Sequence, residues 1–273
     1  MQVEQKFFIG MQDVGNTGIA SNKASNKALI EMLSNVATVH AIQVGQSALQ
    51  RKDLDMIWMV INWKLQVIKR PAACTTVTAR TWAGRYNKLK AIRDFEILNE
   101  AGEIVALATS DWVAIGPDRS SFIRLDESNM GPYQCEPDHE SLPGTTFSKV
   151  REKDFEKLSE TLLTIGRSMI DCNGHMHNTA YLDLVNEVLP DDLDEACFDH
   201  VEINYRKEIL VHDTVRIELA AEKPGHTSDP EAAGAEEDSA PKYCIFVRSE
   251  DGKVLHATIL LSNSNGRQKA LGL

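Results

Sequence analysis

The feature that most constrains the fold of this 273-residue chain is an internal repeat. Residues 28–36 (ALIEMLSNV) align with residues 180–188 (AYLDLVNEV), and both segments place apolar side chains at helical spacing. Residues 60–67 (VINWKLQV) align with residues 202–209 (EINYRKEI), and both alternate apolar and polar side chains with the period of a strand. A chain that holds the same succession of elements twice is expected to build the same fold twice.

A third pair of segments extends the repeat. Residues 95–109 (FEILNEAGEIVALAT) align with residues 246–258 (FVRSEDGKVLHAT), and each has two strand-like runs around a turn with Gly and acidic residues. Each half therefore reads as a long helix followed by antiparallel strands. We predict the α+β class and a tandem, or double, hotdog fold, in which each half wraps a curved antiparallel sheet around its helix.

Two segments break the pattern. Residues 126–145 contain three prolines and little periodicity, which predicts a linker between a first half, 1–125, and a second half, 146–273. Residues from about 222 to 241 are rich in Pro, Gly, Ala and acids and show no apolar periodicity. They are predicted to form a disordered insertion between two strands of the second half.

The net charge of −11 argues against a nucleic-acid partner, because affinity for phosphate backbones comes largely from Lys and Arg. No apolar run approaches the roughly 18 residues that a membrane-spanning helix needs, and the first residues lack the pattern of a secretory signal. We therefore expect a cytoplasmic protein. The five cysteines are widely spaced and contain no CxxC pair, so neither a disulfide framework, a metal site nor another cofactor is expected.

The candidate site lies where the two halves differ. Before the second predicted helix, polar side chains occupy alternate positions: Asp171, Asn173 and His175. We expect this stretch to be extended, which would send all three to one side and Cys172 to the other. The first half has different residues at the aligned positions, namely Ile19, Ser21 and Lys23.

The aligned strands differ in the same sense. Glu208 aligns with Gln66 in the repeat, so a carboxylate that can take a proton is replaced in the first half by an amide that cannot. Asn178 is the expected N-cap of the following helix, whose free N–H groups could hold the negative charge that develops in acyl transfer. His177 fits either the cap or the site. Singly, such residues are often caps or solvated charges, but their joint absence from the first half predicts a catalytic site in the second.

These residues resemble a known family. The segment DCNGHMHNTAY (171–181) is similar to the Asp-x-Asn-x-His-(apolar)-Asn-Asn-x-x-Tyr signature of plant and bacterial acyl-acyl-carrier-protein thioesterases, and YRKEI (205–209) resembles their Tyr-Arg-Arg-Glu-Cys segment. The likeness extends over nearly the whole chain. It implies hydrolysis of the thioester between a fatty acyl chain and the phosphopantetheine arm of acyl carrier protein, which releases free fatty acid.

The resemblance also implies roles for single residues. Glu208 would be the general base that takes a proton from water, His175 and Asn173 would position that water or the thioester, and Asp171 would orient the network. Two positions depart from the family pattern: His177 replaces an Asn, and Ile209 replaces a Cys. The second departure argues against a cysteine nucleophile. Cys172 is the other candidate thiol, and its alternative role is that of a small buried residue.

The implied partner is acyl carrier protein, which is strongly acidic. Residues 79–93 (ARTWAGRYNKLKAIR) contain five cations and no acid, which predicts a docking surface made of Arg80, Arg85, Lys88, Lys90 and Arg93. The alternative is an ordinary solvated pair of strands and their turn. The sequence leaves open whether the protein is a homodimer.

Three other functions fit the same residues. A hotdog thioesterase could act on acyl-CoA, a hotdog dehydratase could act on 3-hydroxyacyl thioesters with His and an acid, and a non-enzymatic protein could bind acyl chains. The carrier that supports the faster reaction, the chemical product and the presence of turnover distinguish them. The preferred chain length depends on the depth of an apolar pocket and cannot be predicted from these motifs.

Overall fold

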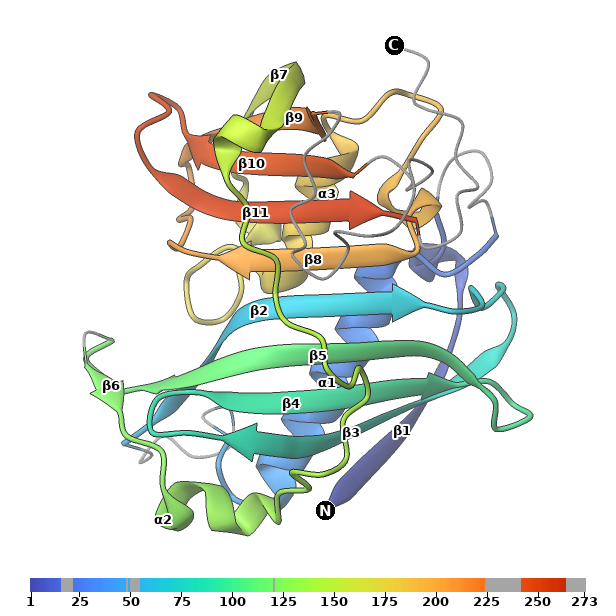
Figure 1. The fold of residues 1–273 in the computed structure, drawn as a ribbon, viewed down its shortest axis with the longest axis vertical. Helices are drawn as coiled ribbons and strands as arrows, with labels where there is room; N and C mark the ends of the chain where they lie inside the picture. The colour runs from blue at the N-terminus through green and yellow to red at the C-terminus, as the bar shows by residue number, and fades with distance from the viewer. Residues whose placement is uncertain (16–21, 48, 50–54, 120, 224–241, 264–273) are drawn as a thin grey trace. The chain divides into compact units, whose positions relative to one another are not determined.

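The computed structural model describes residues 1–15, 22–47, 49, 55–119, 121–223 and 242–263 (Figure 1). The chain divides into two compact units. The first comprises Met1–Val14, Asn22–Ala24 and Ala28–Thr145, and the second comprises Gly15, Ser25–Lys27 and the described residues from Thr146 onward. Within the described residues, no helix combines the length and the apolar composition needed to cross a bilayer.

The first unit is an antiparallel sheet with one long helix. Its strands are β1 (Gln2–Phe8), β2 (Ile57–Val67), β3 (Thr76–Tyr86), β4 (Ala91–Leu98) and β5 (Ile104–Ile115), in the order β1-β3-β4-β5-β2, with β6 (Phe122–Ile123) paired to β5. Helix α1 (Asn26–Gln43) runs across one face of these strands (Figure 1). Its apolar side, including Leu29 and Leu33, is fully buried, as is Trp63, whose ring lies 4.9 Å from that of Phe95. The helical period predicted for residues 28–36 is confirmed.

The second unit repeats the same topology. Its strands are β7 (Phe155–Thr164), β8 (His200–Tyr205), β9 (Thr214–Glu222), β10 (Tyr243–Ser249) and β11 (Leu255–Ser262), in the order β8-β11-β10-β9-β7. With β7 to β11 in place of β1 to β5, this is the strand order of the first unit. The β4–β5 and β10–β11 hairpins lie where the third pair of repeated segments predicts them.

The repeat is less regular than predicted at two places in the second unit. Helix α3 (Tyr181–Asn186) has only six residues and follows a 3₁₀ turn, η6 (Asn178–Ala180), so the prediction of a second long helix was wrong. Pro190 disfavours helical backbone at Leu189, so the helix cannot extend beyond that residue. Strand β8 ends at Tyr205, whereas β2 continues to Val67. Glu208 therefore lies in a loop and not on a strand as predicted.

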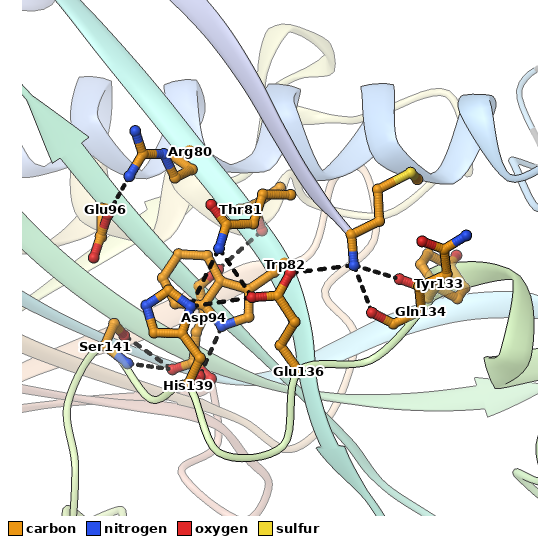
Figure 2. Close-up of polar contacts among 12 residues, drawn as sticks. Arg80, Thr81, Trp82, Asp94, Glu96, Tyr133, Gln134, Glu136, His139 and Ser141 are labelled. Atoms are coloured by element: carbon orange, nitrogen blue, oxygen red, sulfur yellow. Dashed lines mark hydrogen bonds and ion pairs between the residues drawn. The ribbon is translucent and has the colours of Figure 1, made fainter.

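The segment predicted as a linker, 126–145, is packed on the first unit. It contains α2 (Glu127–Met130) and a 3₁₀ turn, η3 (Gly131–Tyr133), and the side chains of Met130 and Tyr133 are buried in a core cluster with Leu125. Farther along, the ring of His139 stacks on Trp82 at 4.0 Å, and the Trp82 indole N–H donates to the His139 carbonyl (Figure 2). We call residues 126–145 the packed segment. The predicted disordered insertion falls mostly on residues 224–241, outside the described residues, while Glu222 at its start ends β9.

Candidate active site

A tight turn carries the polar residues that precede α3. The backbone N–H of Asp171 donates to the His175 carbonyl at 2.8 Å, and the N–H of Gly174 donates to the Asp171 carbonyl at 3.1 Å. Gly174 has a φ of 86°, in the left-handed region that favours glycine. The prediction that residues 171–175 form extended chain was wrong, because Gly174 reverses the chain direction there.

The carboxylate of Asp171 holds this turn together. Its Oδ1 accepts hydrogen bonds from the backbone N–H groups of Asn173 at 2.8 Å and His175 at 3.2 Å, and its Oδ2 accepts one from the Asn173 side-chain amide at 3.2 Å. This is the local carboxylate-to-backbone bonding by which Asp stabilises turns. Asp171 and Asn173 are thus brought together, by a turn and not by strand alternation.

His175 and Glu208 meet across two loops. Nε2 of His175 lies 3.0 Å from Oε2 of Glu208. The backbones are also joined, since the N–H of Met176 donates to the carbonyl of Ile209 at 2.8 Å and His175 forms a bridge with Leu210. The side chain of Glu208 is 48% exposed and that of His175 is 20% exposed. The structure thus gives a histidine–carboxylate pair that solvent water can reach.

The start of α3 is tied to the end of β8. The Tyr205 hydroxyl donates to the Asn178 carbonyl at 2.8 Å, and the Tyr205 ring meets the Tyr181 ring edge-on at 5.1 Å. Burial, and then the negative charge of Glu208, raise the pKa of the Tyr181 phenol. Both tyrosines belong to the quoted motifs, yet sequence reasoning gave them no role.

His177, and not Asn178, caps the 3₁₀ turn η6 that leads into α3. The Nδ1 atom of His177 accepts from the Thr179 backbone N–H and lies 2.9 Å from the Thr179 hydroxyl, while the N–H of Ala180 donates to the His177 carbonyl. The cap role left open for His177 is therefore the one observed. The N–H groups of Thr179 and Ala180 are occupied by this cap, and α3 is short, so the predicted helix N-terminus does not offer these two groups to a substrate.

His256 is a residue that sequence reasoning missed. It lies on β11 with its side chain buried, and its Nδ1 is 3.0 Å from the carbonyl oxygen of Glu208 and 3.2 Å from that of Lys207. A titratable residue inside a strand was the available signal. Its contact with the loop of Glu208 depends on where β8 ends, which the alignment did not show.

The thiol of Cys172 is exposed in the turn, so its alternative role as a buried residue was wrong. Ile209, at the family position of a cysteine, is fully buried. In the first unit, the aligned residue Gln66 remains in the regular β2–β5 ladder opposite Leu107, and Lys23 forms a backbone bridge with Ala72. The aligned Ile19 and Ser21 lie outside the described residues.

The sequence predicts one unopposed basic surface from the five cations of residues 79–93. The structure does not have such a surface. Arg93 is buried, with Nη1 3.0 Å from Nδ1 of His40 and its guanidinium over the Tyr133 ring. Acidic partners distant in sequence neutralise three others, in the ion pairs Arg80–Glu4, Arg80–Glu96 (Figure 2), Arg85–Glu140 and Lys90–Asp111. Lys88 is exposed. A count of charges along one hairpin could not show acids that arrive from other strands and from the packed segment.

Two units of the same topology, each a curved sheet with a helix, define a double hotdog protein with a polar site in its second unit. The chain belongs to the acyl-ACP thioesterase family: the family's N-terminal domain matches residues 2–133 and its C-terminal domain matches residues 152–260. Among solved structures, an acyl-ACP thioesterase from Bacteroides thetaiotaomicron superposes with a TM-score of 0.75 at 17% identity, covering 96% of this chain and 97% of that one. A 12:0-ACP thioesterase from Umbellularia californica gives a TM-score of 0.75 at 18% identity, with 96% and 93% covered.

Curated plant proteins are similar in sequence. The oleoyl-acyl carrier protein thioesterase 2, chloroplastic, of Arabidopsis thaliana is 25% identical over 236 residues, which cover 81% of this chain and 63% of the relative. The dodecanoyl-[acyl-carrier-protein] hydrolase, chloroplastic, of Cinnamomum camphora is 26% identical over 212 residues, which cover 69% and 52%. The chain therefore spans between half and two thirds of the length of these two relatives.

Proposed function

We propose that the protein hydrolyses the thioester of a fatty acyl chain carried by acyl carrier protein, with water as the nucleophile. The observation that carries the proposal is the 3.0 Å contact between His175 and Glu208, which joins the two family motifs in the second unit. Curated relatives across the matched length are named as thioesterases or hydrolases of acyl-acyl-carrier-protein substrates. The proposal extends that activity to this chain.

Glu208 is the general base in this scheme. Its carboxylate takes a proton from a water molecule, whose oxygen attacks the thioester carbonyl carbon and forms a tetrahedral intermediate. Collapse of the intermediate breaks the carbon–sulfur bond and expels the carrier thiolate, which regains a proton from Glu208. The products are a fatty acid and the free thiol of the carrier.

The residues of the turn serve this step by position. An N–H at Nε2 of His175 donates to Oε2 of Glu208 and fixes the direction of the carboxylate. The side-chain amide of Asn173, which is held by Asp171, orients the thioester or the attacking water, and Asp171 holds the turn through its three hydrogen bonds. Preorganised polar groups of this kind lower a barrier because they need no rearrangement as charge develops.

A cysteine nucleophile is a weaker alternative. A reactive thiolate needs an adjacent base or cation, and the position next to Glu208 holds the buried, apolar Ile209. In the described part of the chain, no hydrogen bond joins the Cys172 thiol to an imidazole or a carboxylate. Attack by water needs no thiol, and the Glu208 carboxylate supplies its base.

The test is release of free thiol from a purified acyl-acyl-carrier-protein substrate, followed with a thiol reagent, with detection of the fatty acid. Wild type should turn over, and Glu208→Gln, which keeps size and removes the base, should lose at least about 100-fold in kcat with little change in KM. Glu156→Gln, an exposed acid on β7, is the matched control.

Other outcomes would contradict the proposal. Faster turnover of acyl-CoA would indicate a CoA thioesterase, an enoyl product without free thiol would indicate a dehydratase, and binding without turnover would indicate an acyl-binding protein.

A further inference from the structure

Strand β8 leaves its sheet three residues before Glu208. Its last ladder partner is Ala257 opposite Tyr205, and the next residue of β11 is His256. A chain that leaves a sheet must find new partners for its N–H and C=O groups, because unpaired buried polar groups are costly. His256 provides these partners.

One residue thus serves four backbone groups of the departing loop. The carbonyl oxygen of His256 accepts from the N–H of Arg206 at 2.8 Å and from that of Lys207 at 3.1 Å. Its Nδ1 lies 3.2 Å from the Lys207 carbonyl and 3.0 Å from the Glu208 carbonyl. The side chain is 6% exposed, so water competes little for these bonds.

The chemistry of the acceptors fixes the hydrogen on the ring. Carbonyl oxygens only accept hydrogen bonds, so Nδ1 of His256 must carry the hydrogen and donate it. An imidazole keeps this hydrogen in the Nδ1–H tautomer and in the charged form alike. His256 is therefore a donor aimed at the backbone of Glu208 itself.

The first unit shows what a strand does without this device. Gln66, which aligns with Glu208, stays in the ladder opposite Leu107, and β2 runs on to Val67. By the ladder register, Thr109 of β5 stands where His256 stands in β11, and its hydroxyl donates to the Arg93 carbonyl on the neighbouring strand β4. The first unit thus combines a regular strand with a short side chain that bonds elsewhere, and the second combines a departing strand with a buried histidine.

We propose that His256 is a positioning residue, which holds the backbone of residues 206–208 out of the sheet so that the Glu208 carboxylate lies against His175. This inference rests on the proposed function, in which Glu208 is the base. A displacement of about 1 Å in a reacting group can lower the rate on the order of 100-fold. Loss of a hydrogen bond that fixes the backbone of the base should therefore lower kcat.

Three variants of His256 distinguish the effect of its hydrogen-bond donor from the effect of its side-chain size. Asn places an amide N–H at nearly the position of Nδ1, Gln places it one atom farther out, and Leu has none. We expect His256→Leu and His256→Gln to lose about 10- to 100-fold in kcat at nearly constant KM. His256→Asn should stay within a few-fold of wild type. If the Leu variant does not fold, the Asn and Gln variants, both polar amides, still give the comparison.

A double variant tests whether His256 acts through Glu208. In the Glu208→Gln background, His256→Gln should cost little further activity, because the group it positions is already gone. An equal loss in both backgrounds, or equal rates for the Asn and Gln variants, would overturn the proposal.

A second measurement does not depend on activity. Amide hydrogen exchange at Arg206, Lys207 and Met176 should quicken in His256→Gln and stay near the wild-type rate in His256→Asn. Unchanged exchange in His256→Gln would overturn the positioning role. Exchange that follows this pattern in a protein without thioesterase turnover would support the positioning and contradict only the proposed function.

Discussion

Nε2 of His175 lies 3.0 Å from Oε2 of Glu208, and each residue reaches this contact from a loop and not from a regular helix or strand. Loops are held less firmly than sheets, so the geometry of the pair depends on the groups that fix those loops. Asp171 and Gly174 shape one of them, and His256 braces the other.

The two units should contribute unequally to the reaction. His175→Ala removes the partner of Glu208 and should lower kcat by about 100-fold or more. Lys23→Ala changes the aligned position of the first unit and should stay within a few-fold of wild type. Steady-state kinetics of both variants is the measurement, and comparable losses would show that the first unit shares the chemistry.

The left-handed turn at Gly174 should matter to activity beyond its effect on stability. A Cβ at Gly174 would meet no atom within 4 Å, so Gly174→Ala costs only the strain of a positive φ, about 1 kcal/mol. Gly102, with a φ of 80° and equally open surroundings, provides the matched control in the β4–β5 turn. Both alanine variants should lose similar free energy of unfolding, and only Gly174→Ala should lower kcat. Equal kcat values for the two would separate the turn from catalysis.

The exposed thiol of Cys172 should be dispensable. Cys172→Ala keeps the turn, which depends on Asp171 and Gly174, and should retain nearly full kcat. Mass spectrometry of wild type during turnover should show no acyl group on the protein. An acyl group on Cys172, together with full activity of Glu208→Gln, would replace the water mechanism with a covalent one.

Docking of the acidic carrier should depend on the cations that remain exposed. Lys88→Glu should lower kcat/KM several-fold at low salt, and the difference from wild type should shrink as salt screens the charge. Lys253→Glu, on an exposed side chain of the β10–β11 turn, is the control. If kcat/KM of the wild type does not change with salt, the carrier does not dock electrostatically on the β3–β4 hairpin.

Acid should destabilise the first unit through His40. Burial, and then the adjacent Arg93 guanidinium, lower the pKa of His40 to about 3. The unfolded chain takes up a proton near the ordinary pKa of about 6.5, and the folded chain does not. Stability from this group is therefore complete above that value and declines as the pH falls toward 3, by about 2 kcal/mol at about pH 5.

Urea unfolding at several pH values tests this statement. His40→Gln cannot titrate, so the wild type should lose more free energy of unfolding than the variant between about pH 7 and pH 5. If the free energy of unfolding depends on pH in the same way for both proteins, His40 takes up its proton in the folded state as well.

The periodicity of the sequence was sufficient to predict the tandem fold. Side chains that repeat every two or every 3.6 residues report burial on one face, and both hairpins carry Gly at the turn. The length of α3 and the end of β8 were not predicted, because both depend on contacts distant in sequence. His256 lies in a different segment of the alignment from Glu208, and only the folded sheet brings the two together.

The site was predicted in its composition but not in its geometry. Asp, Asn and His at alternate positions fit a strand, and they fit a carboxylate-held turn equally well. The dipeptide Asn173-Gly174 is a turn signal that favours the second interpretation. The position of Arg93 was predicted wrongly. A cation in a charged segment is expected at the surface, but Arg93 lies in the core beside His40.

The packed segment decides where this chain can be recombined with its relatives. A chimera joined at residue 125 would take Met130 and Tyr133 away from the core cluster that they complete, and would uncover the indole of Trp82. A junction after Thr145 leaves that core intact, because the packed segment then stays in the same chain as the first unit on which it packs. Exchange of first halves between this chain and a relative should therefore be made after residue 145.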